Sequence, residues 1–166
     1  MKCVLFVLVI CLLFMGLQKH SPSLVGKWWL DLKKSENLPS SFKSIDRYEM
    51  EIQQVRDSMT VLVELIGSGQ DVKFPSSVYK FNGPEMFRED SLRGIKRWYK
   101  ARWVERGKKF SVTTRVEQHS MKGGQRFRQT EMWEILDDGT LRVSMTQRFP
   151  PRDSTVSQRR YFHRVK

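Results

Sequence analysis

Hydrophobic and polar side chains alternate along most of the chain, with a period of two residues. Between Ile45 and Val55, Tyr48, Met50 and Ile52 share one face, and the polar residues between them share the other. This pattern predicts a half-buried β-strand, because successive side chains of a strand point to opposite sides. Similar patterns predict strands at residues 25–32, 45–55, 59–66, 72–81 with an interruption at Pro75, 95–105, 110–119, 125–136, 141–149 and 155–165.

Short turn sequences separate these predicted strands. Asn82-Gly83, Gly107-Lys108 and Asp137-Asp138-Gly139 contain residues that tight turns favour. No segment has the longer period of an amphipathic helix. Roughly eight to ten strands joined by such turns predict an all-β fold, an antiparallel up-and-down β-barrel, because closure removes exposed sheet edges. A β-sandwich is the alternative, although it normally needs longer connections between its two sheets.

Two connections are longer than the others. Residues 33–42 contain Pro39 and predict a loop or a single short helical turn, which could cover one end of the barrel. Residues 84–94 predict an excursion from the barrel, with a helical turn around residues 86–92.

Composition indicates one domain behind an N-terminal leader. The chain has 166 residues, enough for a single domain with a core. The apolar run from Val4 to Leu17 is short for a bilayer span and suits the hydrophobic region of a signal peptide. We therefore expect a signal peptide at residues 1–23, a domain at residues 24–166, and a secreted or periplasmic protein. An uncleaved membrane anchor is the alternative, because an Ala-x-Ala cleavage site is absent.

The chain is strongly basic, with a net charge of +12. Removing the leader takes away two of the thirty Lys and Arg residues and no acid, so the charge becomes +10. Both cysteines, Cys3 and Cys11, lie in the leader, so the expected domain has neither a disulfide nor thiol chemistry. A basic exported protein is expected to meet anionic lipid or polysaccharide surfaces, whereas export argues against a dedicated nucleic-acid role.

Several short motifs are spaced along residues 24–166. They are Gly26-Lys27-Trp28 followed by Leu30-Asp31, Ala101-Arg102-Trp103, Phe110-Ser111-Val112-Thr113-Thr114, Thr130-Glu131-Met132-Trp133-Glu134-Ile135 followed by Asp137-Asp138-Gly139, and Tyr161-Phe162-His163-Arg164. In this order they resemble the lipocalin-like domain family of small bacterial secreted proteins, within the calycin superfamily. The resemblance implies a lipocalin-like β-barrel.

The same resemblance implies a structural closure at one end of the barrel. In lipocalins a tryptophan of the first strand packs against an arginine of the last strand. Antiparallel pairing of the first and last strands here would place Trp28 opposite Arg164. The chain lacks the disulfides and the C-terminal helix of the larger eukaryotic lipocalins, so their ligands are not implied.

Signals for catalysis are weak. His119 and His163 are the only histidines of the expected domain, and neither has metal-ligand spacing. Gly67-Ser68-Gly69 lacks the spacing of a nucleophile elbow and predicts a turn. We therefore expect no metal, no cofactor and no enzymatic activity.

Several polar residues fall in phase with apolar ones on the predicted inner faces. In a dry core such groups would cost about 1–3 kcal/mol each if unpaired, so the pattern favours a partly hydrated cavity. Aromatic walls with a few donors suit a small hydrophobic or amphipathic acidic molecule. The residues expected to bind it are Arg97, Tyr99, Trp103, Phe127, Gln129, Glu131, Gln147 and Arg160. The alternative is a packed barrel, filled by Met50, Ile52, Val61, Val63 and Leu65.

A different arrangement competes on the last strand. Fatty-acid-binding relatives of lipocalins hold a carboxylate with an arginine-x-tyrosine pair there, and Arg159 with Tyr161 is similar. However, Arg160 shares a phase with Arg164, so the Trp28 closure favours Arg160 on the inner face. The Arg159–Tyr161 clamp is therefore the minor alternative.

A basic stripe is the other functional candidate. It consists of Lys96, Trp98, Lys100, Arg102 and Arg106. On one strand face these residues would form a positive outer surface, either an ordinary solvated face or a site for anionic lipid or polysaccharide. We therefore expect an exported monomer that binds a small ligand without catalysis. A packed interaction module that acts through its basic outer face is the second hypothesis.

Overall fold

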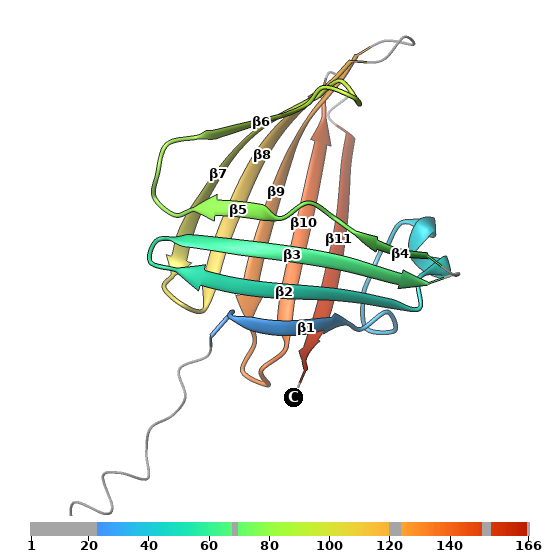
Figure 1. Ribbon diagram of the computed structural model, residues 1–166, viewed down its shortest axis with the longest axis vertical. Coiled ribbons are helices and arrows are strands. Elements are labelled where there is room, and N and C mark those ends of the chain that lie inside the picture. The colour runs from blue at the N-terminus through green and yellow to red at the C-terminus, as the bar shows by residue number, and fades with distance from the viewer. Residues whose placement is uncertain (1–22, 68–69, 120–123, 151–153, 166) are drawn as a thin grey trace, which may run out of the picture.

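The computed structural model describes residues 23–67, 70–119, 124–150 and 154–165, which form an antiparallel β-barrel (Figure 1). The elements in these residues are β1 (Gly26–Leu30), the 3-10 turn η1 (Ser40–Ser44), β2 (Arg47–Val55), β3 (Ser58–Gly67), β4 (Gln70–Lys73), β5 (Ser77–Lys80), β6 (Met86–Asp90), β7 (Ile95–Glu105), β8 (Lys109–Gln118), β9 (Gln125–Ile135), β10 (Leu141–Phe149) and β11 (Ser154–Arg164). The predicted all-β, up-and-down fold is confirmed.

The last strand returns beside the first, which joins two halves of the sheet. The strand order is β4-β3-β2-β1-β11-β10-β9-β8-β7-β6, and β5 also pairs with β3. In Figure 1 the strands of the β1–β5 half cross in front of those of the β6–β11 half. The halves also meet where Phe81 forms an isolated bridge with Ala101. In the described chain no ladder joins β4 to β6, so the barrel opens on that side.

The described residues form eleven strands, slightly more than the sequence predicts. Pro75 separates β4 from β5, and both short strands pair with β3, as an interrupted strand should. The helical turn predicted around residues 86–92 is wrong, because Met86 to Asp90 form β6 and pair with β7. Phe87 and Glu89 lie opposite Trp98 and Lys96, so the ladder satisfies backbone groups that a helical turn would have paired locally.

An aromatic cluster fills the end of the barrel where the halves meet. Phe110 is fully buried, and its ring centroid lies 5.4 Å from that of Phe81 and 5.2 Å from that of Trp133. Trp103 stacks on Phe81 at 4.3 Å. These rings come from both halves, so their packing fixes the halves against each other at this end.

Trp28 and Arg164 lie at the junction of β1 and β11. They face each other in the antiparallel register, and the guanidinium of Arg164 lies 4.6 Å from the indole centroid. Gly26 has a φ of +136°, and a Cβ there would lie 3.2 Å from Nη1 of Arg164. A glycine at this position therefore leaves room for the arginine to lie across the buried indole.

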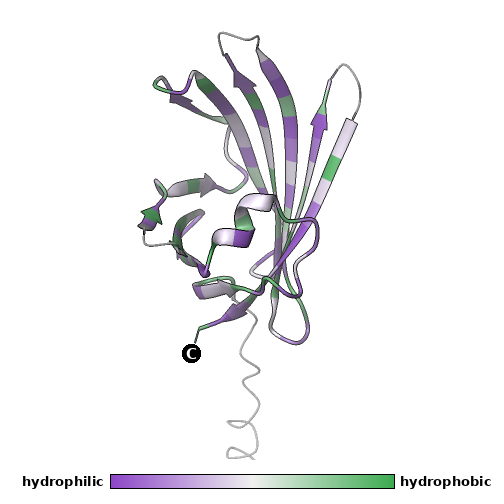
Figure 2. Cartoon of the chain, turned by 90° about the vertical axis from the view of Figure 1, so that its right-hand side faces the viewer, coloured by the Kyte–Doolittle hydropathy of each residue, from purple (hydrophilic) through white to green (hydrophobic). Residues whose placement is uncertain are grey.

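Hydropathy alternates along the long strands (Figure 2). Because successive side chains of a strand point to opposite sides, alternate residues of these strands face inward. On the β7–β11 sheet the strand registers align these inner residues in rows. From the aromatic end, the rows are Trp103, Phe110, Trp133, Val143 and Arg160; then Ala101, Val112, Glu131, Met145 and Gln158; then Tyr99, Thr114, Gln129, Gln147 and Val156; and then Arg97, Val116 and Phe127.

The predicted leader, with Cys3, Cys11 and almost all of residues 1–23, lies outside the described residues. Within the described part of the chain, no helix has the length and hydrophobicity needed to cross a membrane.

Candidate functional site

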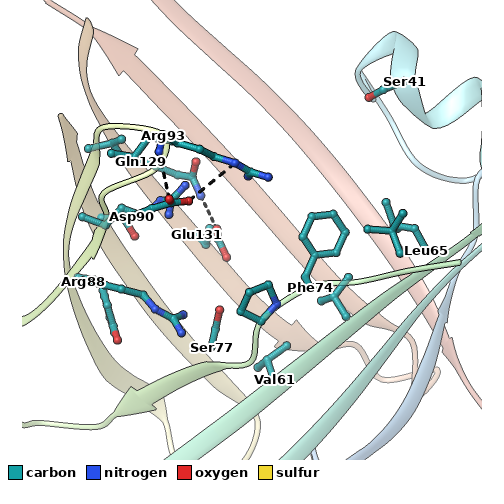
Figure 3. A pocket seen from close by; sticks show the side chains of 18 of the residues that line it. Ser41, Val61, Leu65, Phe74, Ser77, Arg88, Asp90, Arg93, Gln129 and Glu131 are labelled. Atoms are coloured by element: carbon teal, nitrogen blue, oxygen red, sulfur yellow. Dashed lines mark hydrogen bonds and ion pairs between the residues drawn. The ribbon is translucent and has the colours of Figure 1, made fainter. Parts of the chain in front are cut away.

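A cavity of about 1330 Å³ lies between the two halves of the barrel (Figure 3). Its lining comes from β2 to β9, from β11 and from the segment that carries η1. The aromatic cluster packs one end of the barrel, whereas the cavity occupies the part where β4 and β6 are unpaired. The cavity is larger than most small-molecule pockets, which suits a long ligand or one with bound water.

The β1–β5 half gives the cavity an apolar wall. Val61, Val63 and Leu65 point inward from β3, and Phe74 follows β4. Tyr79 lies opposite Met59 in the β3–β5 ladder and packs edge-on against Tyr99 at 5.9 Å. Among the described residues that line the cavity from this half and from the η1 segment, none is charged.

The β6–β11 half gives the cavity its charged side chains. The charged lining residues are Arg88, Glu89, Asp90, Arg93, Arg97, Glu131 and Arg160, although the Glu89 side chain lies on the outer face, opposite Lys96. Asp90 pairs with Arg93 at 3.8 Å, and Glu89 pairs with Lys96 at 3.8 Å. Arg88, Arg97, Glu131 and Arg160 make no ion pair with any described residue, although Nη1 of Arg88 donates to the backbone oxygen of Ser76 at 3.0 Å. Unpaired charges in a cavity favour a ligand that supplies the missing partners.

Three polar side chains and one indole form a hydrogen-bonded chain on the inner face of β9 and β10. Nε2 of Gln147 donates to Oε1 of Gln129 at 2.8 Å, and Nε2 of Gln129 donates to Oε1 of Glu131. The other carboxylate oxygen of Glu131 accepts from Nε1 of Trp133 at 2.8 Å. The chain fixes the Glu131 carboxylate and satisfies the buried indole N–H.

Arg160 lies on the inner face of β11 beside the η1 segment. Its Nε donates to Oε1 of Gln158 at 2.9 Å, and its guanidinium lies 5.4 Å from the ring centroid of Phe42. Burial raises the pKa of Tyr48, while the nearby charge of Arg160 opposes this rise. Tyr48 therefore stays neutral, and a hydrogen bond with Arg160 also acts against the rise.

Six of the eight residues predicted to bind a ligand line the cavity. They are Arg97, Tyr99, Phe127, Gln129, Glu131 and Arg160. Gln147 does not line the cavity; it lies opposite Gln129 on β10 and donates a hydrogen bond to it. Trp103 does not line the cavity, because it stacks on Phe81 in the aromatic cluster. A ligand-binding role for these residues stays a prediction.

The sequence interpretation missed most of the opposite wall. Tyr48, Phe74 and Tyr79 line the cavity, as does Phe42 of η1. Tyr48 could have been found, because it shares the inner face of β2 with Met50 and Ile52. Phe42 could not, because its position depends on how the loop before β2 folds back over β11.

The Arg159–Tyr161 clamp considered as an alternative does not face the cavity. Nη1 of Arg159 lies 3.1 Å from Oε2 of Glu36, and Nζ of Lys34 lies 5.0 Å from the ring centroid of Tyr161. Both side chains point away from the inner residues Gln158, Arg160 and Phe162, because alternate residues of β11 face opposite sides.

The basic stripe lies on the outer face of β7, except that Arg106 lies in the turn after this strand. Lys96 is paired with Glu89, and Nε of Arg102 donates to Oγ of Ser111 at 3.4 Å. Lys100 is exposed. The guanidinium of Arg115, on β8, lies 4.4 Å from the indole centroid of Trp98. The stripe therefore contains fewer free cations than the sequence suggests.

A second outer row of arginines, which we call the arginine row, crosses the strands at Trp98. Trp98 lies opposite Arg115, Arg115 opposite Arg128, and Arg128 opposite Arg148, on β7 to β10. All three arginines are exposed. Only Arg115 approaches a carboxylate among the described residues, Glu85 at 4.0 Å. Like charges directly opposite on neighbouring strands repel one another, so this row is not explained by stability.

Neither histidine belongs to a cluster of potential metal ligands among the described residues. Nε2 of His163 lies 2.8 Å from Oδ2 of Asp31. No group of three or more His, Cys, Asp and Glu side chains within the described ranges could hold a metal ion.

No protein-family model and no curated protein matches the chain. Among solved structures, a fatty acid binding protein of Schistosoma mansoni, in complex with arachidonic acid, is similar with a TM-score of 0.52. It is 18% identical, and the alignment covers 89% of this chain and 100% of that chain. A mutant of the fatty acid transporter REP1-NXSQ is 17% identical, with a TM-score of 0.48 over 86% of this chain and 98% of that chain. At 18% identity the likeness to the Schistosoma mansoni protein shows the fold alone, an antiparallel β-barrel.

Proposed function

We propose that the protein binds a small amphipathic acidic molecule in the cavity and does not catalyse a reaction. The observation that carries this proposal is the segregation of charge: one wall is apolar, and the opposite wall holds Arg88, Arg97 and Arg160 without carboxylate partners among the described residues. A ligand with an apolar body and an acidic group complements both walls. The arachidonic acid in the Schistosoma mansoni protein is a molecule of this chemistry, in a barrel of similar fold.

The proposal extends to where the protein works. The basic, apolar leader supports export, so the ligand would be bound in the periplasm or outside the cell. Membership of the secreted lipocalin-like family and a monomeric state are parts of the same proposal. A carrier of this kind needs neither a metal nor a cofactor.

The first experiment is native mass spectrometry of the protein purified from the cells that make it, followed by identification of any bound molecule. The proposal predicts one lipid or other amphipathic acid per chain. Loss of this adduct in Arg160→Gln, and its retention in Arg159→Gln, would support the cavity as the site. These residues are adjacent on β11 and face opposite sides, so the second variant is a matched control for charge.

A titration makes the same test quantitative. We expect oleic acid to displace the apolar anion 1-anilinonaphthalene-8-sulfonate from the protein. The Arg160→Gln variant should bind oleic acid about tenfold or more weakly, because a hydrogen bond to a charged group contributes about 1.5–3 kcal/mol. If neither compound binds the wild-type protein, the cavity proposal is wrong.

The arginine row favours a second function, binding of an anionic surface through the outer face. Arg128 and Arg148 lack carboxylate partners in the described chain, and Phe87 is 52% exposed beside Trp98. We expect retention on vesicles rich in phosphatidylserine to weaken steeply with salt. Arg128→Gln combined with Arg148→Gln should abolish retention and leave oleic acid binding unchanged. Retention that is equal on neutral vesicles would contradict this function.

A further inference from the structure

Glu131 is the carboxylate of the charged wall that no cation neutralises. The other two lining carboxylates, Glu89 and Asp90, pair with Lys96 and Arg93. Glu131 makes no ion pair with a described residue, although it lies between β8 and β10 on the inner face of the sheet. An apolar ligand body that covered this carboxylate would remove its water without replacing it, which is costly.

The carboxylate is held in a fixed orientation that leaves part of it available. Each oxygen accepts one hydrogen bond, from Nε2 of Gln129 and from Nε1 of Trp133. An ionised carboxylate has about four acceptor positions, so about two remain. Figure 3 shows Gln129 and Glu131 facing Val61, Leu65 and Phe74 across the pocket. Those three side chains have no donor that could fill the remaining positions.

The charge of Glu131 affects the pKa values of two tyrosines on the opposite wall. Burial is the main cause that raises the pKa of Tyr79, and the charge of Glu131 raises it further. The charge of Glu131 also acts to raise the pKa of Tyr48. The carboxylate therefore acts across the space that a ligand would occupy.

Glu131 lies between Arg97 and Arg160, two of the three lining arginines that make no ion pair with a described residue. Arg97 is two strands away on β7 and Arg160 is two strands away on β11, in rows on opposite sides of the Glu131 row. With strands about 4.8 Å apart and a rise of about 3.3 Å per residue, the Cα atoms of Glu131 and Arg160 are roughly 12 Å apart, and those of Glu131 and Arg97 roughly 16 Å. A ligand whose acid group binds either arginine would thus pass Glu131 part-way along its body.

We propose that the ligand carries a hydrogen-bond donor, a hydroxyl or an amine, within its apolar body, and that Glu131 accepts this donor. The inference rests on the proposed function, because it takes the cavity as the binding site. It narrows the ligand class from amphipathic acids in general to acids that also carry an internal donor. A site built around such an acceptor rejects an analogue without the donor, because the buried acceptor is then left unpaired.

Three fatty acids that share a backbone test the inference on the wild-type protein. Oleic acid has no donor in its chain, ricinoleic acid adds one hydroxyl, and the methyl ether of that hydroxyl keeps the oxygen but loses the donor. We expect ricinoleic acid to bind about tenfold or more tightly than both of the others. Equal binding of all three would overturn the inference and leave the proposed function standing. Failure of all three to bind would overturn both.

Glu131→Gln tests whether the preference comes from this carboxylate. We expect the variant to lose the preference for ricinoleic acid and to bind oleic acid at least as tightly as the wild type does. The control is Glu117→Gln, which removes a carboxylate that faces outward from β8 and lies 3.7 Å from Arg126. This control should keep the preference. A Glu131→Gln variant that discriminates as well as the wild type would also overturn the inference.

Discussion

The two halves of the barrel contribute opposite chemistry to the same cavity. On β3, successive inward positions are Val61, Val63 and Leu65, and the described lining of the β1–β5 half carries no charge. On β9, the corresponding inward positions include Gln129 and Glu131, and every charged residue of the described lining comes from the β6–β11 half. The strands of both halves have the same alternation, so the difference lies only in which residues face inward.

The outer faces of the two halves differ in how their basic residues are paired. On the β1–β5 half, three basic residues pair with acids on the same or neighbouring strands: Lys27 with Glu51 at 3.9 Å, Arg47 with Glu49 at 2.7 Å and Lys73 with Glu64 at 3.4 Å. On the β6–β11 half, the arginine row is nearly without acids. Charges that contribute only to solubility are usually interspersed in sign, whereas unpaired charges in one place point to a partner. The β6–β11 half therefore carries both candidate functions.

The strongest way to break this arrangement is to separate the two walls at their packed end. Phe110→Ala removes the fully buried ring that contacts Phe81 of one half and Trp133 of the other. Deleting such a ring leaves a void, so we expect the free energy of unfolding to fall by about 3–5 kcal/mol. Urea denaturation measures this change. Phe87→Ala, on the exposed outer face, should change it by less than about 1 kcal/mol.

A charge placed on the apolar wall tests whether this wall has to be apolar for a ligand to bind. Leu65→Arg adds a guanidinium opposite Gln129 and Glu131 and removes apolar contact area, which contributes about 1.5–3 kcal/mol for a whole leucine side chain. We expect the affinity for 1-anilinonaphthalene-8-sulfonate or oleic acid to fall about tenfold or more in a fluorescence titration. Leu62→Arg adds the same charge to the outer face of the same strand and should leave the affinity unchanged. Equal effects of both variants would show that binding is not in the cavity.

A substitution at the junction of β1 and β11, where the two halves are joined, should change the stability by less. Arg164→Ala removes the cation that lies over the indole of Trp28. A cation–π contact contributes about 0.5–2 kcal/mol, so we expect a loss of about 1 kcal/mol in the free energy of unfolding. Arg159→Ala is the control, because Arg159 pairs with Glu36 at the exposed surface. If Arg159→Ala lowered the free energy of unfolding as much as Arg164→Ala does, the contact between Arg164 and Trp28 would have no particular role in stability.

The smallest expected effect on stability comes from Asp31, which directly follows β1. The hydrogen bond from His163, then that from the backbone N–H of Lys34, hold the pKa of Asp31 below its usual value of 3.8. A lowered pKa in the folded state means that the ionised carboxylate stabilises the fold above its usual pKa. This contribution is lost as the pH falls through the folded value. Between about pH 5 and pH 2, wild-type stability should therefore fall more than that of Asp31→Asn. Asp71→Asn, an exposed control on β4, should behave as the wild type does.

The fold was predictable because the signals for it are local. The alternation of hydrophobic and polar residues predicted the inner faces of β2, β3 and β7 to β11, and Gly, Asn and Asp residues predicted the turns. The β6 strand was not predictable in this way, because Met86 to Asp90 contain three charged residues in a row and pair only with the edge of β7. An edge strand with one neighbour needs no hydrophobic face, so alternation says little about it.

The cavity was predictable on one side only. Polar residues in phase with apolar ones, such as Gln129 and Glu131, mark a lining that a dry core would not tolerate. The opposite wall is made of ordinary core residues, and nothing in Val61, Val63 or Leu65 tells a cavity lining from a packed interior. Alternation alone does not tell which inward residues line the cavity. Trp103 faces inward but is half-buried in the aromatic cluster at the packed end, and Gln147 faces inward beside Gln129 on a strand that does not line the cavity.

The central claim is that one ligand lies between an apolar and a charged wall. The most direct test is a crystal structure of the protein with a fatty acid brominated at its terminal carbon, because the anomalous signal of bromine locates the apolar end. The account predicts bromine beside Val61, Val63, Leu65 or Tyr79, with the carboxylate within hydrogen-bonding distance of Arg97 or Arg160. Bromine on the outer face, or a carboxylate against the β1–β5 wall, would contradict it.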